Sequence, residues 1–206
     1  MKLKRIHRME EYIDKKDVVS LKELSKKFNV SMNTIRRDIN YLEKNGVVKK
    51  VYGGVTATKG SELTTFDFRN TKNSDAKNRI AKVAAEQIED NDVIFIDSGT
   101  TTAPIIKNLN EDLKITILTN NLDVVIDASK NKNIELIILG SRYSHNTRSF
   151  LDIDQEKDSI GFYNVTKSFM AATGISIENG LTNSDFNEYN TKKNYGKTGS
   201  RILYIN

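Results

Sequence analysis

One stretch decides the fold of the first part of the chain: Val30-Ser31-Met32-Asn33-Thr34-Ile35-Arg36-Arg37-Asp38-Ile39-Asn40-Tyr41-Leu42. Ser31 suits the position before a helix, because its hydroxyl can accept a hydrogen bond from a free backbone N–H of the first turn. Ile35, Ile39 and Leu42 then follow at spacings that place them on one helical face. The stretch therefore predicts an amphipathic helix that begins after Ser31.

The opposite face of this helix carries side chains that suit base recognition. At about 100° per residue, Asn33, Arg37 and Asn40 lie opposite the apolar face. Arg36 and Tyr41 flank them. A guanidinium can donate two hydrogen bonds to guanine, an amide can pair with adenine, and the positive charges suit phosphates. A solvated helix whose arginines touch nothing explains the same pattern, so the neighbouring sequence has to decide.

Two patterns before this stretch complete a helix-turn-helix. Residues 4–15 carry apolar side chains at helical spacing and predict a first helix. Ser20 precedes a second helix over residues 21–28, and Glu23, three positions later, makes a capping box with it. Asn29-Val30 is the short turn before the recognition helix, which is helix-turn-helix spacing.

The segment after the recognition helix predicts a two-stranded wing. Gly46 ends the helix, as a glycine commonly does at this position. Residues 47–55 then alternate apolar and basic side chains and run into Gly53-Gly54. A surface hairpin with solvated lysines is the plainer alternative. The side chains that the wing is expected to bring to the DNA backbone or minor groove are Lys49, Lys50 and Tyr52.

Charge divides the chain into two parts. Residues 1–56 hold 14 Lys or Arg against 7 Asp or Glu, a net charge of +7, whereas the remainder carries −2. A basic small domain beside a near-neutral larger one is typical of a nucleic-acid-binding head on a body with another task. We therefore predict a head over residues 1–56, a connector over 57–73 without sustained periodicity, and a body over 74–206.

Composition excludes several other classes. The chain has no cysteine and only two histidines, His7 and His145, so we expect no metal site, no cofactor and no histidine-dependent catalysis. No run of about 18 apolar residues is present to span a membrane. The basic start leads into polar sequence instead of a signal peptide, so we expect a cytoplasmic protein without a membrane partner.

The body predicts a parallel α/β sheet. Short apolar runs at 93–96, 115–118, 134–139 and 167–172 alternate with helical segments. Each run ends in polar or glycine residues, and ligands bind at the carboxyl ends of such strands. The first turn precedes a helix start at Ala103, where helix N–H groups favour an anion. The residues expected to converge on one small polar ligand are Asp97, Ser98, Gly99, Thr100, Thr101, Thr102, Asn120, Gly140 and the loop of Gly174.

The head resembles the DeoR family of bacterial transcriptional regulators. The resemblance rests on Val30-Ser31-x-x-Thr34-Ile35-Arg36-Arg37-Asp38, followed by Gly46 and Gly53-Gly54. It implies a winged helix-turn-helix that binds double-stranded operator DNA, with repression as the outcome. It also implies a homo-oligomer, a dimer or tetramer, whose paired heads fit a symmetric or repeated site. The residues that the resemblance places at the DNA are Ser31, Thr34, Arg36 and Arg37.

The resemblance extends through the body. Lys77-x-Arg79-Ile80-Ala81, Asp97-Ser98-Gly99-Thr100-Thr101, Thr119-Asn120 and Gly180-Leu181-Thr182 are similar to the sugar-phosphate-sensing half of DeoR regulators. That half resembles ribose-5-phosphate isomerase in fold. The resemblance implies that Asp97 takes sugar hydroxyls and that residues 98–102 hold the phosphate. Lys77 is interpreted as a surface residue of a helix and stays outside the expected site.

The C-terminal part departs from the family pattern. Residues 185–193 read like the start of a family helix, but residues 194–200 lose helical periodicity. Family members continue through a strand and an Asp-Ser-Ser-Lys loop, which is missing from this sequence. We therefore expect an effector domain that is incomplete at its C-terminus, lacking a late strand and the lysine of its site.

Three functional readings remain open. The first is a repressor of a sugar operon that a phosphorylated sugar releases from DNA. The second is a DNA-binding protein whose defective body is blind to ligands. The third is a sugar-phosphate isomerase, which needs a placed general base. For that enzyme the sequence offers only Asp97 and Glu188, and neither stands in an isomerase motif, so we expect no catalytic residues.

Overall fold

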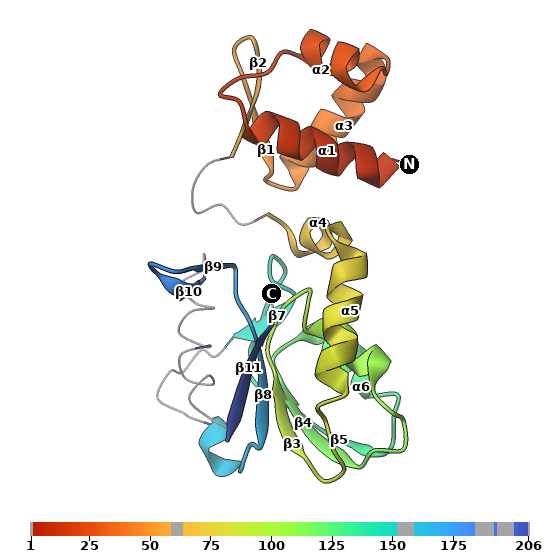
Figure 1. The fold of residues 1–206 in the computed structure, drawn as a ribbon, viewed down its shortest axis with the longest axis vertical. Coiled ribbons are helices and arrows are strands. Elements are labelled where there is room, and N and C mark those ends of the chain that lie inside the picture. The colour runs from red at the N-terminus through yellow and green to blue at the C-terminus, as the bar shows by residue number, and fades with distance from the viewer. Residues whose placement is uncertain (1, 59–63, 152–158, 184–191, 193–199, 206) are drawn as a thin grey trace. The chain divides into compact units, whose positions relative to one another are not determined.

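A computed structural model describes residues 2–58, 64–151, 159–183, 192 and 200–205 of the 206-residue chain. These residues form two compact units, Met1–Lys72 and Asn73–Asn206, shown in Figure 1. The predicted start of a helix at 185–193 lies outside the described residues except for Lys192, as does Glu188. None of the described helices is both long and apolar enough to cross a membrane.

The first unit, called the head below, is a winged helix-turn-helix. Its recognition helix α3 begins where Ser31 was expected to cap it, with the Ser31 hydroxyl accepting from the backbone N–H of Thr34. Ser20 caps α2 in the same way through the N–H of Glu23. Gly46 has a φ of +71° after the end of α3, which confirms its role as a helix terminator. The elements are α1 Lys2–Asp14, α2 Leu21–Phe28, α3 Met32–Lys44, β1 Val48–Val51, β2 Gly54–Ala57 and α4 Phe66–Thr71.

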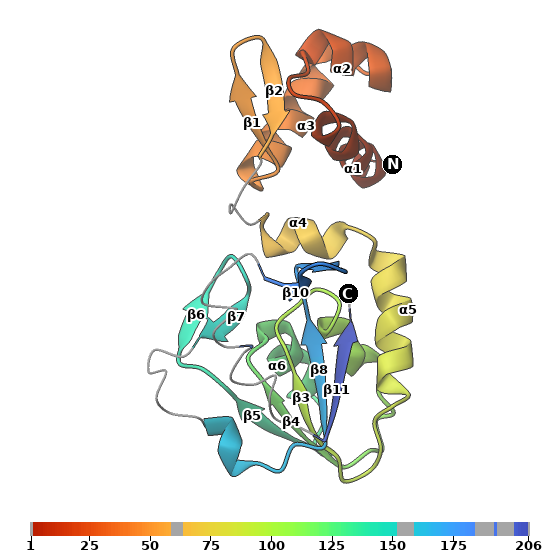
Figure 2. The same ribbon diagram turned by 60° about the vertical axis from the view of Figure 1, so that its left-hand side comes forward.

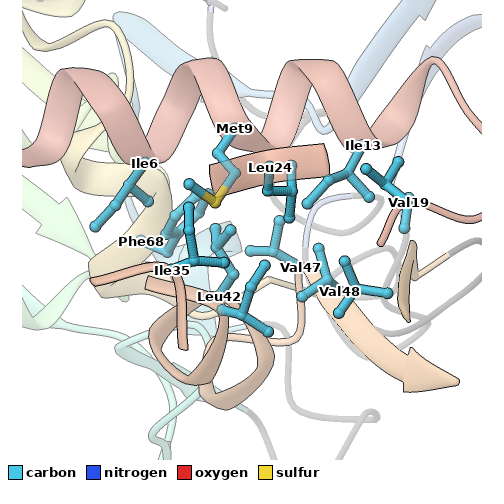
Figure 3. Close-up of a cluster of buried hydrophobic side chains, with 13 residues drawn as sticks. Ile6, Met9, Ile13, Val19, Leu24, Ile35, Leu42, Val47, Val48 and Phe68 are labelled. Carbon is cyan, nitrogen blue, oxygen red and sulfur yellow. The ribbon is translucent and has the colours of Figure 1, made fainter. Parts of the chain in front are cut away.

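The core of the head lies between the three helices and the wing (Figure 3). Ile35, Ile39 and Leu42 are fully buried in it, as the periodicity of α3 predicts. The wing is held against this core because Val19 and Val55 form an isolated antiparallel bridge between the loop before α2 and strand β2. The buried face of the recognition helix is therefore fixed by close packing in the core of the head.

The expected connector over 57–73 contains a helix, so the prediction of an irregular segment is wrong for its second half. Thr65 caps α4 by accepting from the N–H of Phe68, at 3.3 Å. Phe68 is 1% exposed and belongs to the core of the head. The sequence does not reveal this role of Phe68, because the apolar residues that it packs against lie on helices far earlier in the chain.

The second unit, called the body below, is a five-stranded sheet in the order β11-β8-β3-β4-β5, and every pair is parallel (Figure 2). Its strands are β3 Val93–Ile96, β4 Ile115–Thr119, β5 Ile134–Ile138, β8 Lys167–Ala171 and β11 Arg201–Ile205. Two short antiparallel pairs accompany it: β6 Arg142–Ser144 with β7 Ser149–Leu151, and β9 Gly174–Ser176 with β10 Gly180–Thr182. The parallel α/β sheet predicted from the sequence is confirmed.

The two faces of the sheet have separate apolar clusters. α5 Ser74–Ala85, the 3₁₀ helix η1 Ala103–Asn108 and α6 Leu122–Ala128 pack against one face (Figure 1). Ile160, from the 3₁₀ helix η2 Ser159–Phe162, packs against the other. Both faces are covered, as is usual for a parallel sheet.

Two expectations for the body are corrected. The segment after the first turn is a six-residue 3₁₀ helix, η1, instead of an α-helix, so the support it gives to anion binding through a helix dipole is weak. The expected loss of a late strand is wrong as well, because Arg201–Ile205 pairs in parallel with β8 at the edge of the sheet. The run Arg201–Ile205 is too short to identify a strand without its neighbour β8.

Candidate DNA-binding surface and candidate effector site

The exposed face of α3 is the one that the sequence predicts. Arg36, Arg37 and Asn40 are exposed, as is Asn33 near the start of the helix. Asn33, Arg37 and Asn40 stand opposite the buried isoleucines and Arg36 flanks them, so the face is accessible to a partner. Contact of these residues with DNA stays a prediction.

Asp38 has a different role from its neighbours in the motif. It is 1% exposed and accepts from both Nε and a terminal nitrogen of Arg5, at 2.7 and 3.2 Å. This hydrogen bond with Asp38 raises the pKa of the Arg5 guanidinium, against the opposing effect of burial. The pair fixes α3 on α1 and so sets the direction in which the recognition face points.

Ser31 and Thr34 are engaged with each other at the start of α3. Their hydroxyl oxygens lie 3.0 Å apart, and Ser31 also accepts from the Thr34 N–H. Ser31 is exposed and Thr34 is partly so. Ser31 therefore caps the helix with Thr34 as its partner, and the role at DNA that the resemblance implies for both residues stays a prediction.

The wing presents one aromatic and two basic side chains. Tyr52 lies in the turn between β1 and β2 and is fully exposed, next to Gly53 with a φ of +87°. Lys49 is exposed on β1. The ammonium of Lys50 donates to the Asn40 amide oxygen at 2.8 Å and to the Glu43 carboxylate. Lys50 thus connects the wing to the recognition helix.

The candidate effector site lies at the carboxyl end of β3. Asp97 is fully buried there and accepts from the N–H of Ser98 at 2.8 Å and of Ala171 at 3.0 Å. The ammonium of Lys192 lies 3.1 Å from the same carboxylate and donates to the Ala171 carbonyl. Burial raises the pKa of Asp97, while Lys192 and the two N–H groups oppose the rise.

The turn after Asp97 is shaped by its own backbone contacts. The Thr102 hydroxyl donates to the carbonyls of Asp97 at 2.7 Å and Gly99 at 3.1 Å. A Cβ on Gly99 would lie 2.6 Å from the Cβ of Ala171, so only glycine fits between the turn and β8. Ser98 and Thr101 are buried. The turn is therefore tightly folded against the sheet.

Lys77 joins this turn from α5. Its ammonium donates to the Thr100 hydroxyl at 2.8 Å, so it is not the plain surface residue that the sequence suggested. Lys192 is the second lysine that sequence reasoning missed, so the site contains lysines although the Asp-Ser-Ser-Lys loop of the family pattern is missing from the sequence. Thr100 lies 23 positions after Lys77, so no local pattern could have connected them.

The other predicted effector residues are Asn120, Gly140 and Gly174, each of which follows a strand of the sheet. Asn120 is 1% exposed and follows β4 as Asp97 follows β3. Gly140 has a φ of +87°, and a Cβ there would lie 2.7 Å from the backbone of Phe150, so packing already accounts for the glycine. Gly174 begins β9 after the end of β8. Among the described residues, no His, Asp and Glu side chains gather in a group of three that could hold a metal ion.

Fold and site together define a two-part DNA-binding protein with a winged helix-turn-helix head and an α/β sensor body. Residues 5–60 match the family model described as the DeoR-like helix-turn-helix domain, and residues 72–203 match the DeoR C terminal sensor domain. The chain belongs to the DeoR family of transcriptional regulators.

Several curated proteins are similar to this chain. It is 48% identical to the HTH-type transcriptional regulator IolR of Bacillus subtilis over 205 residues, which cover 100% of the chain and 81% of that protein. It is 28% identical to the glycerol-3-phosphate regulon repressor of Escherichia coli, over 95% of the chain and 77% of that protein. Ribose 5-phosphate isomerase A of Methanocaldococcus jannaschii aligns with a TM-score of 0.46 at 18% identity, covering 65% of the chain and 52% of the isomerase.

Proposed function

We propose that this regulator represses a carbohydrate operon and that a phosphorylated sugar releases it from its operator. The observation that carries the proposal is the polar cluster at the carboxyl end of β3, where Asp97 and Lys192 pair next to the turn of Thr100, to which Lys77 of α5 donates a hydrogen bond. Carboxylates suit sugar hydroxyls, and lysines suit a phosphate. One relative, the glycerol-3-phosphate regulon repressor, is named for a phosphorylated polyol.

Release requires that the ligand prefer the DNA-free protein. By linkage, a sugar phosphate that lowers operator affinity by some factor is bound less tightly by the DNA-bound form by the same factor. We propose that the working form is a dimer or tetramer, because two heads would fit a symmetric or repeated operator. Sedimentation velocity of the full chain, with and without operator DNA, tests the oligomeric state.

The experiment for this function is fluorescence anisotropy on labelled DNA taken from upstream of the protein's own gene and the neighbouring operon. Titrations run at two salt concentrations, with and without a panel of hexose and pentose phosphates. The unphosphorylated sugars and inorganic phosphate serve as controls. We expect tight binding that weakens steeply with salt and that one sugar phosphate reverses. Binding that no panel member alters would refute the effector part.

A variant pair tests the head separately. Arg37→Ala removes an exposed cation from the face of α3 and should weaken operator binding by about 10- to 100-fold. Arg142→Ala removes an equally exposed arginine from the body and should leave the affinity unchanged. Equal operator affinities of the two variants would contradict the proposal that this face of α3 binds DNA.

The ligand-blind alternative has one observation in its favour. Asp97 pairs with Lys192 and accepts from two backbone N–H groups, so the protein itself supplies partners for this carboxylate. Tight operator binding that is insensitive to the panel is the result expected from this second reading. For catalysis we propose no residue, and incubation with ribose 5-phosphate should yield no isomerised product.

A further inference from the structure

Asn120, directly after β4, holds a buried acceptor for which the described part of the chain supplies no donor. Asn120 is 1% exposed, and no donor among the described residues reaches its side-chain oxygen. Buried polar groups in folded proteins are almost always hydrogen-bonded, so each exception calls for an explanation. The chain contains many asparagines in loops, but this one follows a central strand of the sheet.

The side chains on either side of Asn120, those of Thr119 and Asn121, make hydrogen bonds within the protein. The Thr119 hydroxyl donates to the Ile96 carbonyl at 2.6 Å and accepts from the N–H of Asn121. The Asn121 amide caps α6 by accepting from the N–H of Asp123, and it donates to the Gly99 carbonyl at 3.3 Å. Structure therefore accounts for two of the three polar residues in this run, and Asn120 alone retains an unused group.

Strand register places Asn120 beside Asp97. Ile96 pairs with Thr119, so Asp97 and Asn120 are the next residues along two adjacent parallel strands. Side chains alternate between the two faces of a sheet, so both leave the sheet on the face of Phe95 and Leu118. A molecule held at Asp97 therefore has Asn120 as its lateral neighbour.

The chemistry of the free atom limits what it can bind. A carbonyl oxygen accepts hydrogen bonds only, so it repels a phosphate oxygen and gains nothing from a ketone. A hydroxyl can donate to it, and the amide nitrogen of the same side chain can donate to an oxygen nearby. The enclosed position strengthens such a bond, since water does not compete for the acceptor.

We propose that Asn120 is a specificity-determining residue that accepts a hydrogen bond from a hydroxyl of the effector. The inference rests on the proposed function and adds a requirement to it. The effector carries a free hydroxyl next to the group that Asp97 holds, and an analogue lacking that hydroxyl binds more weakly. The ligand class is thus a polyhydroxylated phosphate ester.

The test measures ligand binding to the full chain without DNA, by isothermal titration calorimetry. Glucose 6-phosphate, fructose 6-phosphate and ribose 5-phosphate are the first probes, and each that binds is compared with its singly deoxygenated analogues. Asn120→Leu removes the acceptor at similar size. Asn164→Leu, at an exposed position of the body, is the matched control.

The wild-type protein should lose about 10- to 100-fold in affinity for one deoxygenated analogue. Asn120→Leu should bind the parent ester as weakly as the wild type binds that analogue, and should no longer distinguish the two. Its melting temperature without ligand should equal or exceed that of the wild type, because an unpaired buried polar group is gone. A merely structural asparagine would give the opposite change in melting temperature.

Each contrary result identifies which statement fails. Wild-type affinity for the parent ester in Asn120→Leu, or equal binding of every deoxygenated analogue by the wild type, overturns the role of Asn120 alone. A marked fall in the melting temperature of Asn120→Leu overturns it too, since the side chain would then have a structural partner. If no ester binds the wild-type protein, the proposed effector fails and this inference fails with it.

Discussion

The two ends of strand β3 use the same residue types for different purposes. At the amino end, Asp92 accepts from Lys167 at 2.6 Å, from the Thr166 hydroxyl at 2.8 Å and from the Glu89 N–H at 2.8 Å. Burial pushes the pKa of Asp92 up, but Lys167 and these hydrogen bonds outweigh it and hold the pKa below its ordinary value.

At the carboxyl end, burial of Asp97 outweighs its lysine and backbone partners, and the pKa is raised. Asn120 lies beside it, and none of the residues that the structure describes donates to its side-chain oxygen. The amino end is thus a structural link between β3 and β8, whereas the carboxyl end holds a buried acceptor to which no described residue donates. The comparison agrees with the general rule that parallel sheets bind ligands at the carboxyl ends of their strands.

The largest effect is expected from removing Lys192, because that leaves a buried carboxylate without its cation. Lys192→Met should lower the free energy of unfolding by about 3 kcal/mol at pH 8. The folded-state pKa of Asp97 would rise further above its unfolded value, so stability should fall as the pH rises above the ordinary range of aspartate. Urea unfolding followed by circular dichroism at pH 5, 7 and 8 measures this.

Lys192→Arg serves as the control, since it keeps the positive charge and should retain more of the wild-type stability. A stability loss in Lys192→Met that is the same at all three pH values would contradict the pairing with Asp97.

Asp92→Asn should have the next largest effect, about 2 kcal/mol at pH 7, because it removes the charge from three hydrogen bonds. The sign of the pH dependence is reversed at this end. A lowered pKa contributes stability above the ordinary range of aspartate, and that contribution disappears as the pH falls through the folded-state pKa. Wild-type and variant unfolding curves should therefore converge in acid, whereas the exposed control Asp112→Asn should match the wild type throughout.

Lys77→Met should have the smallest effect on stability, about 1 kcal/mol, because it removes one partly buried hydrogen bond with Thr100. It should nevertheless weaken binding of the phosphorylated probe more than binding of the unphosphorylated sugar. Calorimetric titration of both ligands checks this, with the exposed Lys82→Met on the same helix as the control. Equal losses for the two ligands would place the phosphate away from Lys77.

Local signals made the recognition helix predictable. Ser31, Gly46 and the spacing of the isoleucines each act on residues a few positions away, so a local sequence pattern is enough to identify them. The strand-turn segment at Asp97 was predictable for the same reason. What the sequence could not supply is any partner that lies far along the chain.

Three misses have this common cause. Asp38 was interpreted only through its motif, although its partner Arg5 lies 33 positions earlier. Lys192 reaches Asp97 across most of the body, and β11 becomes a strand only beside β8. Such contacts form only in the folded protein, and a single sequence does not show which distant residues come close to each other.

The burial of Phe68 in the head changes where this protein can be divided. A gene fragment that stops after residue 57, where the wing ends, would encode a head whose hydrophobic core lacks the buried side chain of Phe68. The segment that can be transferred as a unit is 1–72, because it includes Phe68 and so completes its own core. Fusion of this head to an unrelated sensor, whether by recombination in a genome or by an engineer, therefore has its natural splice point after α4.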